Sequence, residues 1–165
     1  MDEIELSIKR TLESIADHLT KEGKTDTTSW TWEIKTQLTE LAYETYNYNV
    51  YTSPNGYDNT TNECLYDMLW YQSLNGNNND LAIVHLALES EWNTSFAEIK
   101  YDFYKLVQAR TKHRTMIFQS NDVMSVIEKL SKIIDESLIS EIGDRYLFAG
   151  WNDNDGFTFS LKLKE

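Results

Sequence analysis

Apolar and polar residues follow two different periods along this chain, one typical of helices and one typical of strands. In residues 3–22 the apolar side chains lie three or four positions apart from Ile8 onward, which predicts an amphipathic helix that ends at Gly23. Asn121-Asp122 is expected to cap a later helix, because short polar side chains accept hydrogen bonds from the first turn. The same helical spacing predicts further helices at about Thr31–Tyr48, Phe96–Arg110 and Val123–Ser137.

Short runs of β-branched and aromatic residues predict strands between these helices. The clearest is Leu81–Glu91, whose first eight residues are all apolar or histidine. The Asn-rich stretch 74–80 before it predicts a hairpin tip and an antiparallel partner. The other strands are expected at Val50–Thr52, Cys64–Gln72, Arg114–Gln119, Arg145–Gly150 and Phe157–Leu163. This order of elements predicts an α/β fold, with an α+β mixed sheet covered by helices.

The bulk properties predict one domain over residues 1–165. With 41% hydrophobic residues the chain can build a core, and it holds no run of about 20 apolar residues that could cross a bilayer. The acidic start, Met1 to Glu5, lacks the basic and apolar segments of a signal peptide. A single cysteine, Cys64, excludes an intramolecular disulfide and suits a reducing compartment. We therefore expect a cytoplasmic protein with no membrane partner.

The formal charge of −12 argues against a nucleic-acid enzyme, because phosphate binding depends largely on Lys and Arg. Two arrangements would overcome the repulsion. A basic partner protein could supply the affinity, or the basic residues could gather on one surface. Six basic or histidine side chains do fall within fifteen positions, namely Lys100, Lys105, Arg110, Lys112, His113 and Arg114.

Two glutamates at the end of the buried strand are the strongest chemical signal in the sequence. Residues two apart on a strand project from the same face, so Glu89 and Glu91 stand side by side, roughly 7 Å apart along the chain. Two neighbouring carboxylates are unfavourable in a hydrophobic core, but they are good ligands for a hard cation such as Mg²⁺. With Asp67 on the preceding strand-like segment, they indicate a metal-dependent site that cleaves phosphodiesters.

From about residue 32 to residue 118, the order of one helix, three strands, a helix and a strand resembles the α-β-β-β-α-β core of the PD-(D/E)XK nuclease superfamily. An N-terminal helix and C-terminal strands would flank this restriction-endonuclease-like core. In that superfamily an aspartate near the second core strand and an acid on the third bind Mg²⁺ or Mn²⁺. The resemblance implies Asp67 and Glu89 as ligands and Glu91, which stands where the family usually has lysine, as a ligand or base. Glu40 resembles an additional acidic ligand of some members.

Some branches of the superfamily place the lysine on the next helix, where Lys105 lies. A helical projection puts Lys105 almost opposite the apolar stripe of that helix, whereas Lys100 lies nearer its border. The resemblance favours Lys105, with Lys100 as its rival. Asp102 is a further candidate. The alternative interpretation is that Lys105 and Asp102 form an ordinary surface pair at i,i+3.

The sequence thus favours a Mg²⁺-dependent nuclease, acting on DNA, over two alternatives. In the first alternative, the chain is an inactive nuclease-fold protein that serves as an acidic interaction or inhibitor protein. Glu89 and Glu91 would then be ordinary exposed residues at a strand end, and Asp67 would be hydrogen-bonded to a loop. In a third hypothesis, aromatic residues mediate self-association as a homodimer. They are Tyr43, Tyr46, Tyr48 and Tyr51.

Overall fold

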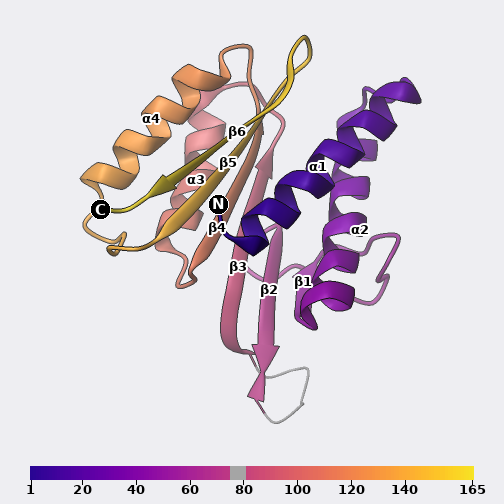
Figure 1. Cartoon of the computed structure of the whole chain (residues 1–165), viewed down its shortest axis with the longest axis horizontal. Helices are drawn as coiled ribbons and strands as arrows, with labels where there is room; N and C mark the ends of the chain where they lie inside the picture. Colours follow the sequence, from indigo (N-terminus) through magenta and orange to yellow (C-terminus); the bar gives the residue numbers. More distant parts are fainter. Residues whose placement is uncertain (75–80) are drawn as a thin grey trace. The chain divides into compact units, whose positions relative to one another are not determined.

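The computed structural model describes residues 1–74 and 81–165, which form an α/β fold (Figure 1). None of the four helices of this part combines the length and the hydropathy needed to cross a bilayer. Most of the predicted hairpin tip falls at 75–80, outside the described residues. The elements are α1 (Glu3–Lys21), α2 (Thr27–Tyr46), β1 (Asn49–Thr52), β2 (Met68–Ser73), β3 (Leu81–Glu91), α3 (Phe96–Gln108), β4 (His113–Gln119), α4 (Val123–Glu136), β5 (Arg145–Asn152) and β6 (Gly156–Leu163).

The chain folds as two compact units, residues 1–86 and 87–165, with β3 belonging in part to each. Strand order follows chain order, β1-β2-β3 in the first unit and β3-β4-β5-β6 in the second. β1 and β2 pair antiparallel, β4 and β5 pair parallel, and β5 and β6 pair antiparallel. The expected order of elements and the mixed pairing are therefore confirmed.

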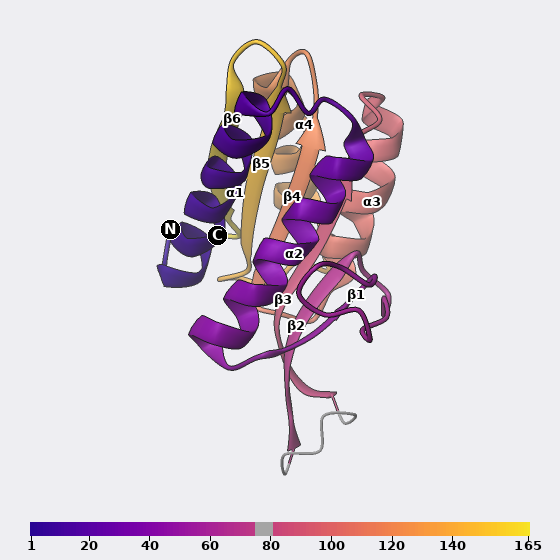
Figure 2. The same cartoon turned by 90° about the vertical axis from the view of Figure 1, so that its right-hand side faces the viewer.

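In the first unit, α1 packs on α2 and α2 packs on β1, and Figure 2 shows the two helices side by side. A capping box begins α1, because the Asp2 side chain accepts from the Glu5 backbone N–H and the Glu5 carboxylate accepts from the Asp2 backbone. The apolar stripe of α1 is buried as its spacing predicts. Its members are Ile8, Leu12, Ile15 and Leu19.

In the second unit, α3 packs on β4 and α4 on β5 and β6, and the two helices contact each other, so they share one face of the sheet (Figure 1). Asp122 caps α4 by accepting a hydrogen bond from Ser125 N–H, which confirms the predicted cap. Gly150 is required on β5, because a Cβ there would lie 2.3 Å from Cγ1 of Val123. The tight contact holds the start of α4 against the strand.

One boundary differs from the prediction in a way that bears on function. The expected strand Cys64–Gln72 begins only at Met68, so the placement of Asp67 on a strand was wrong. Leu65 adopts a left-handed backbone with φ of 68°, and Cys64 and Tyr66 form an isolated bridge around it. This tight turn interrupts the extended backbone, because a strand needs negative φ throughout. Asp67 therefore lies directly before β2.

Candidate active site

The predicted glutamates lie where β3 ends, within the second unit. Leu86, Ala87, Leu88 and Glu89 form the buried part of β3, and Glu89 is only 1% exposed. Glu91 is half-buried on the same face two residues later. Since a buried charge is costly unless it is paired, the carboxylate of Glu89 needs a cation nearby.

Lys105 of α3 supplies that cation. Its Nζ lies 3.2 Å from Oε2 of Glu89 and 2.7 Å from Oδ1 of Asp102, so one ammonium bridges two carboxylates. The lysine side chain is 39% exposed, whereas that of Asp102 is 16% exposed. Burial lowers the pKa of the Lys105 ammonium, but hydrogen bonds and charges from Asp102 and Glu89 outweigh burial and raise it. Lys105 therefore stays charged in the folded protein.

Of the two rival lysines, Lys105 is the one placed against Glu89. Nζ of Lys100 lies instead over the ring of Tyr104, 5.8 Å from its centroid. The projection disfavoured Lys105 because it considers only the angle around the helix axis, and the Lys105 side chain is long enough to reach beyond its own side of α3. Its flexible four-carbon stem then carries the ammonium past Asp102 to the strand.

Glu91 has an altered protonation equilibrium. Burial raises the pKa of its carboxyl group, and the charges of Asp102 and Glu98 raise it further, while a hydrogen bond from the Asn93 backbone N–H opposes them. That N–H donates to Oε1 of Glu91 at 2.6 Å. Glu91 therefore takes up a proton more readily than an ordinary glutamate, which suits a general base.

Two acidic residues of α3 form a helical row with Lys105, and the ion pair between Lys105 and Asp102 confirms the i,i+3 pair named as the alternative in the sequence analysis. Glu98, Asp102 and Lys105 occur at i, i+4 and i+7 of α3, which places them on one side of the helix. Asp102 was only an additional candidate, and Glu98 was missed. The spacing itself was the available signal.

Asp67 and Glu40 belong to the first unit. Asp67 is half-buried, and its backbone carbonyl accepts a hydrogen bond from Oγ1 of Thr52 at 2.7 Å. Glu40 is exposed on α2. Because the second unit holds Glu89, a cation shared by Asp67 and Glu89 stays a prediction.

The cluster of Glu89, Glu91, Asp102 and Lys105 offers carboxylate oxygens to a cation, but it also contains a competing ammonium group. Carboxylate oxygens are preferred ligands of Mg²⁺, and Mg²⁺ commonly uses one or two of them together with water. In the part of the chain that the structure describes, Glu89, Glu91 and Asp102 do not bring three carboxylate oxygens within 4.8 Å of one another. The ammonium of Lys105 lies between two of these groups instead. A Mg²⁺ ion held by Glu89 and Glu91 therefore stays a prediction.

The basic segment predicted to attract phosphate is mostly occupied by internal contacts. His113 and Arg114 are buried, and Lys105 is bound to carboxylates. Arg110 and Lys112 are exposed. Of the six predicted side chains, only Arg110 and Lys112 are therefore exposed and outside the ion pairs described above, and Lys100 is half-buried.

The tyrosines proposed to mediate self-association stack within the first unit. His85 stacks on the ring of Tyr48, with 3.9 Å between the ring centroids, and hydrogen-bonds to Gln72. Much of the aromatic surface is therefore used internally, and homodimer formation stays a prediction. The stacked pairs are Tyr43–Tyr57, Tyr46–Tyr48, Tyr48–His85 and Tyr51–Tyr71.

Comparisons of this chain with protein-family models, with curated proteins and with solved structures gave no match. The function of this protein is therefore inferred from the geometry of Glu89, Glu91, Asp102 and Lys105.

Proposed function

We propose that this protein is a Mg²⁺-dependent nuclease of the PD-(D/E)XK type that hydrolyses phosphodiester bonds of DNA. The observation that carries the proposal is the position of Lys105, whose ammonium contacts the buried carboxylate of Glu89. A lysine beside an acidic strand end is what the chemistry requires, because charge builds up on phosphoryl oxygens during hydrolysis.

Each side chain has a definite task in this proposal. Glu89 and Glu91, with Asp67, would hold the Mg²⁺, and Glu91 is the alternative base for the attacking water. Lys105 would stabilise the negative charge of the phosphoryl group, while Asp102 holds the ammonium in place through its 2.7 Å ion pair. When bound, Mg²⁺ would supply Lewis acidity and lower the pKa of a water molecule.

The test is cleavage of supercoiled plasmid DNA in Mg²⁺ or Mn²⁺ by purified protein and by Glu89→Ala. We expect the substitution to lower the cleavage rate by about 10³-fold, since it removes charge stabilisation at the reacting centre. Glu128→Gln, at an exposed position of α4, is the matched control and should cleave normally. Retained metal-dependent activity in folded Glu89→Ala would exclude the proposed site.

The charge distribution favours a second candidate, an inactive nuclease-fold protein that acts as an acidic interaction or inhibitor protein. Residues 1–86 hold 14 acidic and 5 basic side chains, whereas residues 87–165 hold 13 and 10. Residues 51–86 hold no Lys or Arg. Such a surface attracts a basic partner protein and repels DNA.

Metal binding separates the two candidates. For the enzyme, Mn²⁺ should raise the melting temperature, and Asp67→Ala should remove that increase, because only a bound ligand stabilises the folded state. For the interaction protein, Mn²⁺ should leave the melting temperature unchanged in the natural protein and in Asp67→Ala.

A further inference from the structure

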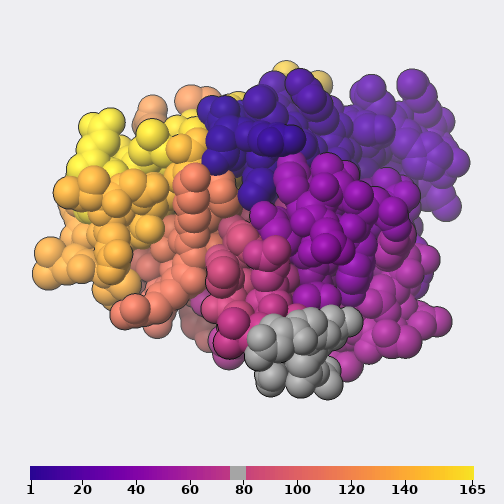
Figure 3. Space-filling view, turned by 60° about the horizontal axis from the view of Figure 1, so that its bottom comes forward, coloured from indigo at the N-terminus to yellow at the C-terminus, as the bar shows by residue number. Residues whose placement is uncertain are grey.

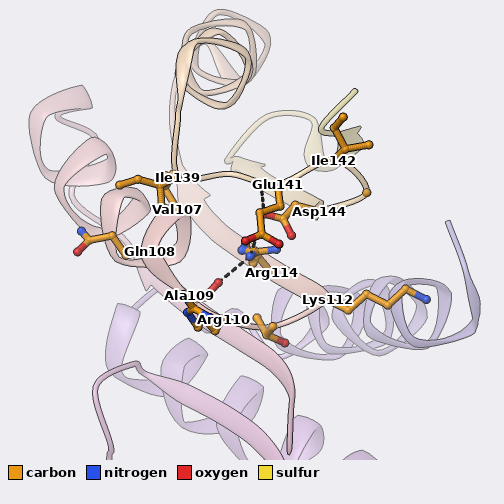
Figure 4. A pocket seen from close by; sticks show the side chains of 12 residues that line it. Val107, Gln108, Ala109, Arg110, Lys112, Arg114, Ile139, Glu141, Ile142 and Asp144 are labelled. Atoms are coloured by element: carbon orange, nitrogen blue, oxygen red, sulfur yellow. Dashed lines mark hydrogen bonds and ion pairs between the residues drawn. The ribbon is translucent and has the colours of Figure 1, made fainter.

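A pocket of about 480 Å³ opens in the second unit, between the segment that joins α3 to β4 and the segment that joins α4 to β5 (Figure 4). In Figure 3 the coral residues of the first segment and the orange residues that follow α4 lie next to each other on the surface. The volume is in the range of pockets that bind small molecules. Glu89, Glu91 and Lys105 do not line it, so it is separate from the candidate active site.

Arg114 gives the pocket a fixed cation. Only 4% of this residue is exposed, and its Nε donates to the Leu106 carbonyl at 3.0 Å. One terminal nitrogen donates to the Ala109 carbonyl at 2.6 Å and pairs with Asp144 at 3.0 Å. The other, Nη1, has no hydrogen-bond partner among the described residues. A buried guanidinium nitrogen without an acceptor is costly, so a ligand oxygen there would be favourable.

Two exposed cations line the same pocket. Arg110 and Lys112 come from the segment before β4 (Figure 4). Of the pocket's two acidic side chains, Asp144 is bound to Arg114 and to the Glu141 backbone N–H, at 2.9 Å. Three cations against two carboxylates leave the pocket net positive in a protein of net charge −12.

Apolar side chains also line the pocket. Val107 of α3 and Ile139 lie next to each other in Figure 4, and Ile142 lies on the other side of Glu141. Ile139 and Ile142 are 61% and 85% exposed, whereas Val107 is buried. Exposed aliphatic side chains beside cations suit a ligand with an anionic group next to a flat apolar group. Guanidinium groups bind phosphate oxygens through paired hydrogen bonds.

We propose that this pocket binds a nucleotide. Its phosphate would contact Arg110, Lys112 and Nη1 of Arg114, and its base and sugar would pack on Val107 and Ile139. The same chemistry is present in a free mononucleotide and in the 5′-phosphorylated end of a nucleic-acid strand. The proposal does not depend on hydrolysis at Glu89.

Calorimetric titration of the whole protein tests this proposal. The ligands are inorganic phosphate, deoxyadenosine monophosphate, deoxyadenosine, and a short oligothymidine with or without a 5′-phosphate. We expect a phosphate-bearing nucleotide to bind with a Kd below about 1 mM and the unphosphorylated forms at least about tenfold more weakly. Tight binding of the mononucleotide indicates a free nucleotide, whereas binding of the phosphorylated oligothymidine alone indicates a strand end.

Matched variants separate the pocket from the overall charge. Arg110→Ala with Lys112→Ala should weaken binding at least about tenfold, because it removes two exposed cations that would contact the phosphate. Lys129→Ala with Lys132→Ala on α4 removes the same charge elsewhere and should change binding less than about twofold.

The proposal is wrong if no phosphate-bearing compound binds, if deoxyadenosine binds as well as its monophosphate, or if both double variants lose binding equally. Glu89→Gln should bind the nucleotide normally. Loss of cleavage with retained nucleotide binding, or the reverse, therefore distinguishes a failure of this proposal from a failure of the proposed nuclease activity.

Discussion

Two buried ion pairs of the second unit differ in which partner is fixed. In the Glu89–Lys105 pair the carboxylate is 1% exposed, and the lysine, 39% exposed, reaches it on a flexible stem. In the Arg114–Asp144 pair the cation is 4% exposed and also donates to the carbonyls of Leu106 and Ala109. The Arg114 guanidinium lies 4.9 Å from the ring centroid of Tyr146 as well.

This difference indicates different uses of buried charge. The planar guanidinium of Arg114 holds several acceptors in a fixed geometry. It thereby links the end of α3 to β4 and to the residue before β5, which is a structural role. An ammonium on a long stem can exchange partners without disturbing the backbone, which would suit a group that moves between a carboxylate and a substrate phosphate. The comparison therefore favours a fixed role for Arg114 and an adjustable role for Lys105.

The largest expected effect on stability comes from Arg114→Ala. It leaves the carboxylate of Asp144 without its cation and the carbonyls of Leu106 and Ala109 without the guanidinium donor, so we expect the free energy of unfolding to fall by about 3 kcal/mol. Urea denaturation measures this loss. Lys132→Ala, which removes an exposed pair on α4, should change it by less than about 0.5 kcal/mol. Equal effects of the two substitutions would mean that Arg114 is not structural.

Lys105→Met should destabilise the fold less, by about 1–2 kcal/mol. Methionine keeps the packing of the stem but removes the ammonium from the buried carboxylate of Glu89. The same urea experiment measures the change. A loss as large as that of Arg114→Ala would contradict the distinction between a fixed and an adjustable pair.

The Lys105 pair also predicts a dependence on alkaline pH. Because the pKa of Lys105 is raised above its ordinary value of 10.5, the folded state holds this proton more tightly than the unfolded chain. Its stabilising contribution is complete below pH 10.5 and is lost as the pH rises through the folded pKa. Urea denaturation across this range should show a steeper alkaline loss in the natural protein than in Lys105→Met. Parallel curves would contradict this assignment.

The smallest effect is expected from Glu91→Gln. The raised pKa means that the fold disfavours the ionised carboxylate, mainly through burial and then through Asp102 and Glu98. Removing the charge should stabilise the protein slightly at pH 7, by about 0.5 kcal/mol or less. The gain should vanish as the pH falls below about 4.5, where the carboxyl is protonated in both states. A loss of stability at pH 7 would show that the charged form is favoured.

Much of the fold could be predicted because its signals are local. The structure confirms α3, which the helical spacing of Ile99 and Phe103 predicted, and the start of α4, which the cap at Asp122 predicted. Leu65 gave no such signal, since the left-handed backbone that delays β2 is rare for leucine. Such a conformation depends on the surrounding structure, so the position of Asp67 could not be derived from its neighbours in sequence.

The sequence by itself determined the order of helices and strands, and it placed Glu89 and Glu91 on one face of a strand, because backbone periodicity fixes both. Only the tertiary structure decided that Lys105 and not Lys100 reaches Glu89, and that Arg114 is buried against Asp144. These contacts join residues 16 and 30 positions apart. Which charges meet across such separations depends on how helices pack on the sheet and how far a flexible side chain extends, and no local pattern encodes that.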